Sequence, residues 1–175
     1  MKLEIDIRPA ARKDSELLAR LGRETFYDAF ANHPRMPGAD LELYLNEAFT
    51  VSQIISELNE PQAAFLLAEI DGQAVGYAKL MTAGRTPGID GENPVKLKRL
   101  YVRRELVGTG IGAGLLSRCL SEAGKSGHDM IWLSVWEHNR KAREFYRRWN
   151  FMPCGVIDFQ FGNTVLMDIL MQRSL

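Results

Sequence analysis

Residues 100–112 read Leu-Tyr-Val-Arg-Arg-Glu-Leu-Val-Gly-Thr-Gly-Ile-Gly. An apolar segment leads through a basic turn into glycines at the alternate positions 108, 110 and 112. Because glycine carries no side chain, a ligand can approach the main chain there, and successive N–H groups can point into one concavity. Apolar residues then recur at helical spacing, at Leu115, Leu116, Cys119, Leu120 and Ala123. The glycines therefore open a helix, whose N-terminal amides and dipole favour an anion such as a pyrophosphate.

Several kinds of protein carry a glycine-rich turn between a strand and a helix. A P-loop nucleotide hydrolase needs Gly-Lys-Ser/Thr at the end of the loop, but Gly112 is followed by Ala113, so this class is excluded. A dinucleotide-binding fold fits the loose pattern Gly108-x-Gly110-x-x-Ala113, and Glu137 follows the next apolar strand at about the expected distance. The loop comes late, however, and too few residues remain for the usual succession of strand-helix-strand units. A tight turn whose glycines serve packing alone is the third alternative.

A second informative segment covers residues 136–151. Asn139, Ala142, Tyr146 and Phe151 stand there at the spacing of the pattern Asn-x-x-Ala-x-x-x-Tyr-x-x-x-Gly-Phe. Together with the glycine loop, this segment resembles the GCN5-related N-acetyltransferases (the GNAT family), which transfer an acetyl group from acetyl-coenzyme A (acetyl-CoA) to an amine. The resemblance implies an α+β fold, in which helices flank a mixed central sheet of about seven strands.

The resemblance also implies the roles of individual residues. The loop written Gln/Arg-x-x-Gly-x-Gly/Ala in the family aligns with residues 107–112 and would bind the pyrophosphate. Tyr146 would be the general acid that protonates the departing thiolate, and Asn139 would hydrogen-bond the pantetheine arm. A backbone N–H on the 100–102 strand, assigned to Val102, would stabilise the developing oxyanion. The expected coenzyme contacts are Leu100, Val102, Val107, Gly108, Thr109, Gly110, Ile111, Gly112, Asn139 and Tyr146.

Three residues depart from the family pattern. Val107 stands where Gln or Arg is usual, which removes a side-chain contact but leaves the backbone amides of the loop. Asn150 replaces the glycine before Phe151, a mild change because Asn tolerates the left-handed conformation that ends many helices. Lys96 stands where relatives commonly carry Glu, so a carboxylate that could act as a base or contact a cationic substrate is missing.

A closer resemblance concerns the acetyl acceptor. Residues 23–30, 44–49, 99–102 and 131–137 are similar to the PaiA-type branch, known as spermidine/spermine acetyltransferases. This similarity implies a small-molecule primary amine, with a polyamine as one candidate. The stretch 40–71 has no Lys or Arg, so its carboxylates could form an acidic wall for a cationic amine or be ordinary exposed charges. They are Asp40, Glu42, Glu47, Glu57, Glu60, Glu69 and Asp71.

The sequence allows more than one general base and more than one function. Family geometry offers Glu24, Asp28 and Glu137 as base candidates, and each can equally be a structural or rim carboxylate. The acceptor can alternatively be a protein or peptide amine. The chain can also be a coenzyme-binding regulatory module without useful catalysis.

Composition and residue spacing give further expectations about domains, partners, location and metals. The chain has 175 residues, 46% of them hydrophobic, and fits one domain over 1–175. Its net charge is zero, so nucleic acid or an acidic membrane is not expected as a partner. With neither a signal-peptide pattern nor an apolar run that could span a bilayer, a cytoplasmic location is expected. Cys119 and Cys154 are expected to be free thiols, and the histidines have no metal-ligand spacing, so no metal is expected. Sheet-mediated homodimers are frequent in the family.

Hydrophobic periodicity predicts the elements. A strand is expected at 2–8, and Asp14-Ser15 can cap a helix that continues to Phe30. The segment Asp71-Gly72-Gln73 predicts a hairpin between strands at 63–70 and 74–81. Further helices are expected at 41–49, 51–58, 113–123 and 139–149, and further strands at 95–102, 130–135, 151–161 and 164–171.

Overall fold

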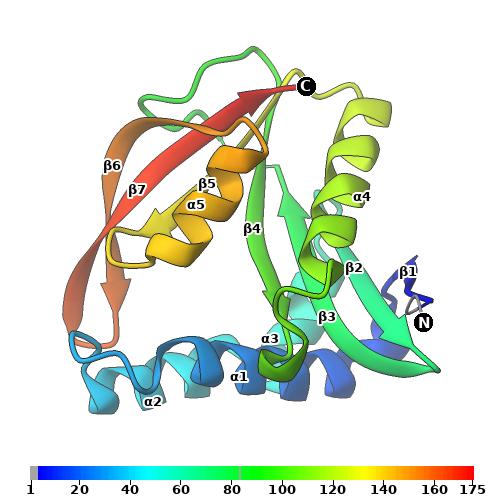
Figure 1. Ribbon diagram of the computed structural model, residues 1–175, viewed down its shortest axis with the longest axis vertical. Helices are drawn as coiled ribbons and strands as arrows, with labels where there is room; N and C mark the ends of the chain where they lie inside the picture. Colours follow the sequence, from blue (N-terminus) through cyan, green and yellow to red (C-terminus); the bar gives the residue numbers. More distant parts are fainter. Residues whose placement is uncertain (1–3, 83) are drawn as a thin grey trace.

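The computed structural model describes residues 4–82 and 84–175 and contains one mixed seven-stranded sheet in the order β1-β2-β3-β4-β5-β7-β6 (Figure 1). This confirms the expected α+β fold. The strands are β1 (Asp6–Pro9), β2 (Ala63–Ile70), β3 (Gln73–Met81), β4 (Pro94–Val102), β5 (Met130–Trp136), β6 (Met152–Phe161) and β7 (Thr164–Ser174). The α-helices are α1 (Ser15–Phe30), α2 (Gly38–Ala48), α3 (Val51–Leu58), α4 (Ile111–Lys125) and α5 (Arg140–Arg148). Short 3-10 helices cover Arg12–Asp14 and Arg104–Leu106.

The element bounds follow the hydrophobic pattern closely. The β2–β3 hairpin turns at Asp71 and Gly72, whose φ angles are 50° and 73°, the positive values that a type I′ turn requires. The first strand starts at Asp6 rather than at residue 2, and residues 2 and 3 of that expectation lie outside the described part of the chain.

The start of α1 differs from the expected cap. Asp14 is the residue before the helix, but its side chain makes no capping hydrogen bond. Its carboxylate instead accepts two hydrogen bonds from the Arg8 guanidinium, at 3.0 and 2.9 Å, and one from the Ala11 backbone N–H at 2.8 Å. A charged, two-pronged donor is a stronger partner than a backbone amide, so Arg8 takes the carboxylate away from the helix.

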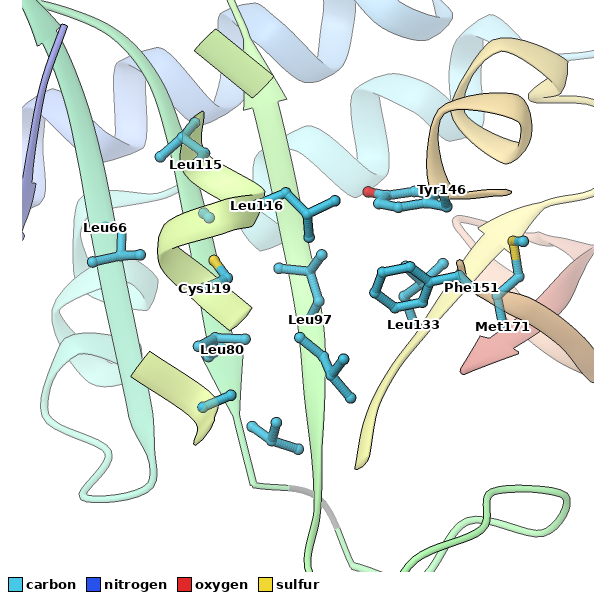
Figure 2. Packing of buried hydrophobic residues seen from close by; sticks show 14 of the residues in the cluster. Leu66, Leu80, Leu97, Leu115, Leu116, Cys119, Leu133, Tyr146, Phe151 and Met171 are labelled. Atoms are coloured by element: carbon cyan, nitrogen blue, oxygen red, sulfur yellow. The ribbon is translucent and has the colours of Figure 1, made fainter. Parts of the chain in front are cut away.

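Two hydrophobic cores lie on opposite faces of the sheet. The first is formed with α4 and α5 and contains Leu115, Cys119 and Tyr146 (Figure 2). The second is formed with α1, α2 and α3 and contains Leu18 and Leu45. The helices therefore cover the sheet from both sides, as the ribbon shows (Figure 1). Among the described residues, none of the helices has the length and apolar character needed to cross a membrane.

The strands β4 and β5 are the parallel pair in the centre of the sheet, and they diverge. Their register runs from Pro94↔Met130 to Lys96↔Trp132 and, in the described chain, no further. Beyond that point β4 continues along β3 as far as Val102, whereas β5 continues along β7 as far as Trp136 (Figure 1). An irregularity in the β3–β4 register, between Lys79↔Arg99 and Leu80↔Leu97, places Lys98 as an extra residue on β4. Such a bulge increases local twist and redirects side chains.

Candidate functional site

A pocket of about 130 Å³ lies where β4 and β5 diverge. Its lining includes Leu97 and Tyr146 from the first core and Phe26 and Phe161 from the second. The pocket therefore passes through the sheet and connects its two faces. The polar and charged groups of the lining are Tyr44, Lys98, Arg99, Tyr101, Ser134, Asn139, Tyr146 and Asp168.

Tyr146 projects from α5 toward β4, with its hydroxyl end toward Leu116 (Figure 2). The residue is 9% exposed, and the Phe151 ring lies 5.6 Å from its own ring. Burial raises the pKa of Tyr146 above its ordinary value. The side chain therefore carries its proton at neutral pH, which is the form that a general acid needs.

Asn139 is the residue immediately before α5. Its Oδ1 accepts a hydrogen bond of 3.2 Å from the Ala142 backbone N–H, which fixes the side chain at the start of the helix. The Asn139 side-chain amide nitrogen donates no hydrogen bond to the described residues, so it is a donor available to a ligand. Asn139, Ala142 and Tyr146 all line the pocket, so one turn-and-helix motif brings these three residues together.

The glycine loop adopts the conformation that its sequence implies. Gly108 and Gly110 have φ angles of 89° and 96°, and Gly110 is the residue from which α4 starts. A Cβ at either position would meet no atom within 4 Å, so backbone conformation rather than crowding calls for glycine. The Thr109 hydroxyl donates a 2.7 Å hydrogen bond to the Leu106 carbonyl, and this contact holds the loop.

The start of α4 is an exposed, positively polarised end. The first amides of an α-helix lack carbonyl partners within the helix. Ile111 is fully buried, so the amides available to an anion are those of the half-buried Gly112 and Ala113. Val107, the departure from the family pattern, is 65% exposed. Its apolar side chain contributes no polar contact here, and the main chain carries the anion-binding capacity.

The glycine loop lies beside both strand β4 and the α5 motif. A Cβ built on Gly112 would lie 3.8 Å from Leu100 and from Val102, and 3.9 Å from Phe145. The two segments identified in the sequence therefore meet at one place, with β4 between them.

The backbone of β4 presents N–H groups to the gap. The Arg103 N–H donates to the Val75 carbonyl of β3 at 2.8 Å. Because successive N–H groups of a strand point alternately to its two sides, those of Val102 and Leu100 point away from β3, toward the gap with β5. Both are therefore placed to donate to an oxygen in the pocket.

A buried ion cluster supports the opposite wall. Glu57 of α3 accepts hydrogen bonds from Arg99 at 2.7 and 3.2 Å and from Lys79 at 2.9 Å. Burial alone would raise the pKa of Glu57, but the charge of Arg99 and the bond from Lys79 outweigh it and lower that pKa. Arg99 lines the pocket, so this cluster connects α3 to the site.

Asp168 on β7 is the carboxylate that lines the pocket, and the sequence reasoning did not identify it. Burial raises its pKa, while a bond with Ser134 and the charges of Lys96 and Lys98 act in the opposite direction. The sequence does carry a sign of this buried carboxylate, because Asp168 is the single charged residue in the otherwise apolar run Val165–Met171.

The base candidates drawn from family geometry lie elsewhere. Glu24 pairs with Arg103 at 2.7 Å, and neither it nor Asp28 nor Glu137 belongs to the pocket lining in the described structure.

The seven carboxylates of the 40–71 stretch do not line the pocket either, so they form no acidic acceptor wall in the described residues. Asp40 accepts a 2.8 Å hydrogen bond from the Asn163 backbone N–H in the β6–β7 turn. Glu42 pairs with Arg23, and Glu69 pairs with Arg8. The charges of these three residues are used in surface and structural contacts.

The described residues contain no group of three or more His, Cys, Asp or Glu side chains that could hold a metal ion. Cys119 is buried, Cys154 is half-buried, and both are free thiols, as expected.

Comparison with known proteins agrees with the geometry. Residues 23–151 match the model of the acetyltransferase (GNAT) family. An uncharacterized N-acetyltransferase of Lactobacillus delbrueckii subsp. lactis is 26% identical over 174 residues, 98% of either chain. One from Mycobacterium bovis is 28% identical over 162 residues, 93% of this chain and 98% of the other.

Solved structures share the fold. The PaiA N-acetyltransferase of Thermoplasma acidophilum, in complex with coenzyme A, superposes with a TM-score of 0.80 at 22% identity, over 99% of this chain and 100% of that one. A GCN5-related N-acetyltransferase of Rhodopseudomonas palustris has a TM-score of 0.78 at 19% identity, over 100% and 99% of the two chains. Since the family model covers most of the sequence, the chain belongs to the acetyltransferase (GNAT) family.

Proposed function

We propose that this protein transfers the acetyl group of acetyl-CoA to the primary amine of a small molecule. Family membership makes the protein an acetyl-CoA-dependent acetyltransferase. The observation that carries the proposal for a small acceptor is the pocket through the sheet, which has about 130 Å³ of space and joins Tyr146 on one face to aromatic side chains on the other. This volume lies below the roughly 300–1,000 Å³ of most ligand pockets, so the space favours a small organic group over a bulky one.

In this proposal the coenzyme would bind on the α4–α5 face. The amides at the start of α4 and the glycine loop would bind its pyrophosphate, and Asn139 would contact its pantetheine arm. The related PaiA protein was solved with coenzyme A, which supports a coenzyme site in this fold. The acceptor would then approach from the face of α1 and α2, where Phe26, Tyr44 and Phe161 line the pocket.

The chemistry follows from the groups that meet in the gap. The amine lone pair attacks the thioester carbonyl carbon, and the N–H of Val102, with that of Leu100 beside it, stabilises the oxyanion. The carbon–sulfur bond then breaks, and the thiolate takes the proton of Tyr146. The amine nitrogen loses one proton as the amide forms, and Asp168 is the pocket carboxylate that can accept it.

An acceptor panel tests the proposal. The protein is incubated with acetyl-CoA and one amine at a time, including spermidine, spermine, simple primary amines, amino acids and short peptides, and release of the coenzyme thiol is measured. Acetylation of small amines supports the proposal. Acetylation of peptides alone would move the function to protein or peptide modification, and tight binding of acetyl-CoA without any transfer would indicate a coenzyme-binding regulatory module.

A further inference from the structure

The acceptor half of the pocket contains two charges that do not pair with each other. Lys98 of β4 and Asp168 of β7 both line it, yet neither makes an ion pair within 4.0 Å in the described part of the chain. Burial lowers the pKa of Lys98 and raises that of Asp168, so both charges are poorly solvated. Ser134 bonds Asp168, but no opposite charge lies within 4.0 Å of Asp168 or Lys98 in the described residues, so a ligand group of opposite charge would lower the cost of burying each of them.

The neighbouring charges are already matched. Arg99 is held by Glu57 at 2.7 Å, and Lys79 contacts Glu57 at 2.9 Å and Glu60 at 3.7 Å. Lys96 lies over the Trp132 ring, with its Nζ 4.5 Å from the ring centroid. Lys98 is thus the cation of the lining that is left for a ligand, as Asp168 is the anion.

The balance of charge argues against a polyamine. A polyamine is a chain of ammonium groups, of which Asp168 can neutralise one. The remaining ammonium groups would meet Lys98, a cation of the lining that no carboxylate within 4.0 Å offsets in the described residues, and it would repel them. An acceptor with one ammonium and one carboxylate would instead satisfy Asp168 and Lys98 together.

The rest of the acceptor half is apolar and aromatic. Phe26, Phe30, Met36, Phe161 and Leu166 line it, so a ligand's hydrocarbon body would be desolvated there. We infer that the acetyl acceptor is a small zwitterionic amine with an apolar body, such as an apolar amino acid, whose carboxylate binds Lys98 and whose amine end faces Asp168. This inference rests on the proposed function and names its substrate class.

Matched substrates test the carboxylate directly. L-Leucine and L-phenylalanine are each compared with their amide and with the amine that lacks the carboxyl group, and spermidine is included as a polycation. The expected kcat/KM is about 10- to 100-fold higher for the acid than for its amide, the size of one charged hydrogen bond. Equal or better turnover of the amides, amines or spermidine would overturn the inference and leave the proposed acetyl transfer to small amines intact. Binding of acetyl-CoA without transfer to any amine would overturn both.

Two variants of Lys98 test whether this residue causes the preference for acids over amides. Lys98→Met keeps a similar shape without the charge, so kcat/KM should fall about 10- to 100-fold for the acids and change little for the amides. Lys98→Arg should retain the preference for acids. Lys125→Met, at the exposed end of α4, is the matched control and should leave all values unchanged. Thermal unfolding checks that each variant is folded. A Lys98→Met protein that is folded and keeps its preference for acids would contradict the role of Lys98.

Discussion

The Arg99 guanidinium lies 2.7 Å from the Glu57 carboxylate, and the two side chains are only 6% and 7% exposed. Arg99 belongs to β4 and lines the pocket, whereas Glu57 belongs to α3, on the sheet face that α1, α2 and α3 cover. Because Lys79 shares the same carboxylate, a single negative charge holds two buried cations. The wall of the pocket therefore depends on a residue that does not itself line it.

Glu57→Gln should destabilise the protein by about 3–5 kcal/mol, because it leaves Arg99 and Lys79 buried without their shared counter-charge. Urea unfolding at pH 7 measures the change. Glu60→Gln is the control: Glu60 is 44% exposed and lies 3.7 Å from Lys79, so its loss should cost under about 1 kcal/mol. Similar losses in the two variants would contradict the buried-cluster interpretation.

The same pair predicts an acid limb of the stability profile. The pKa of Glu57 is lower in the folded protein, so the unfolded chain binds more protons below the ordinary glutamate value of about 4.3. The wild-type free energy of unfolding should therefore fall as the pH drops through that value toward the folded pKa. The profile of Glu57→Gln should lack this part of the decline in unfolding experiments between pH 3 and 7.

Gly110 and Gly124 make a matched pair within one region. A Cβ at either would meet no atom within 4 Å, but Gly110 has a φ of 96°, while Gly124 lies inside α4. Gly110→Ala should destabilise the protein by about 1 kcal/mol or more and weaken acetyl-CoA binding, because the loop must change conformation. Gly124→Ala should stabilise it by up to about 1 kcal/mol. Calorimetric titration and thermal unfolding measure both, and unchanged coenzyme affinity in Gly110→Ala would contradict the loop's role.

Tyr146→Phe removes the proposed acid without changing the packing of the ring. Loss of a general acid typically slows a reaction by 10²–10⁴, so kcat should fall about 100-fold or more while acetyl-CoA affinity changes little. Tyr27→Phe, at a 48% exposed tyrosine of α1, should behave as wild type. Wild-type turnover by a folded Tyr146→Phe protein across the pH profile would reject the acid role.

Local rules explain why the conformations of the glycine loop and of the α5 motif could be predicted from the sequence. Gly108 and Gly110 are needed because their φ angles are positive, and Asn150, with a φ of 63°, adopts the left-handed conformation anticipated for it. Asn139 caps α5 and Tyr146 lies within the same helix, so both belong to one continuous motif. Each of these properties depends on a few neighbouring residues.

The proposed acceptor half depends on long-range arrangement, which a single sequence does not reveal. Lys98 faces the pocket beside a bulge in β4, and a one-residue irregularity changes which side chains reach a given face. In the sequence, Glu57 resembles an ordinary surface charge. In the structure, α3 brings it into contact with Lys79 and Arg99, which are 22 and 42 residues away. Asp168 reaches the pocket because β7 pairs with the divergent strand β5.

The buried Asp168 carboxylate should lower the free energy of unfolding at neutral pH while it supports acetyl transfer. Burial raises its pKa, so the folded protein binds more protons than the unfolded chain above the ordinary aspartate value of about 4. The free energy of unfolding should therefore decrease as the pH rises from about 4 through the folded pKa. Asp168→Asn lacks the ionisable group, so it should be more stable than wild type at neutral pH and should not show this decrease.

The same variant should acetylate all amines more slowly, unlike Lys98→Met, whose effect is confined to acceptors with a carboxylate. Unfolding from pH 4 to 8 and kcat/KM for an amino acid and its amide measure the two effects. Glu137→Gln, at a half-buried carboxylate outside the pocket lining, is the control and should change neither. An Asp168→Asn protein that is less stable at neutral pH but fully active would show that the carboxylate is a structural partner rather than a group held for the amine.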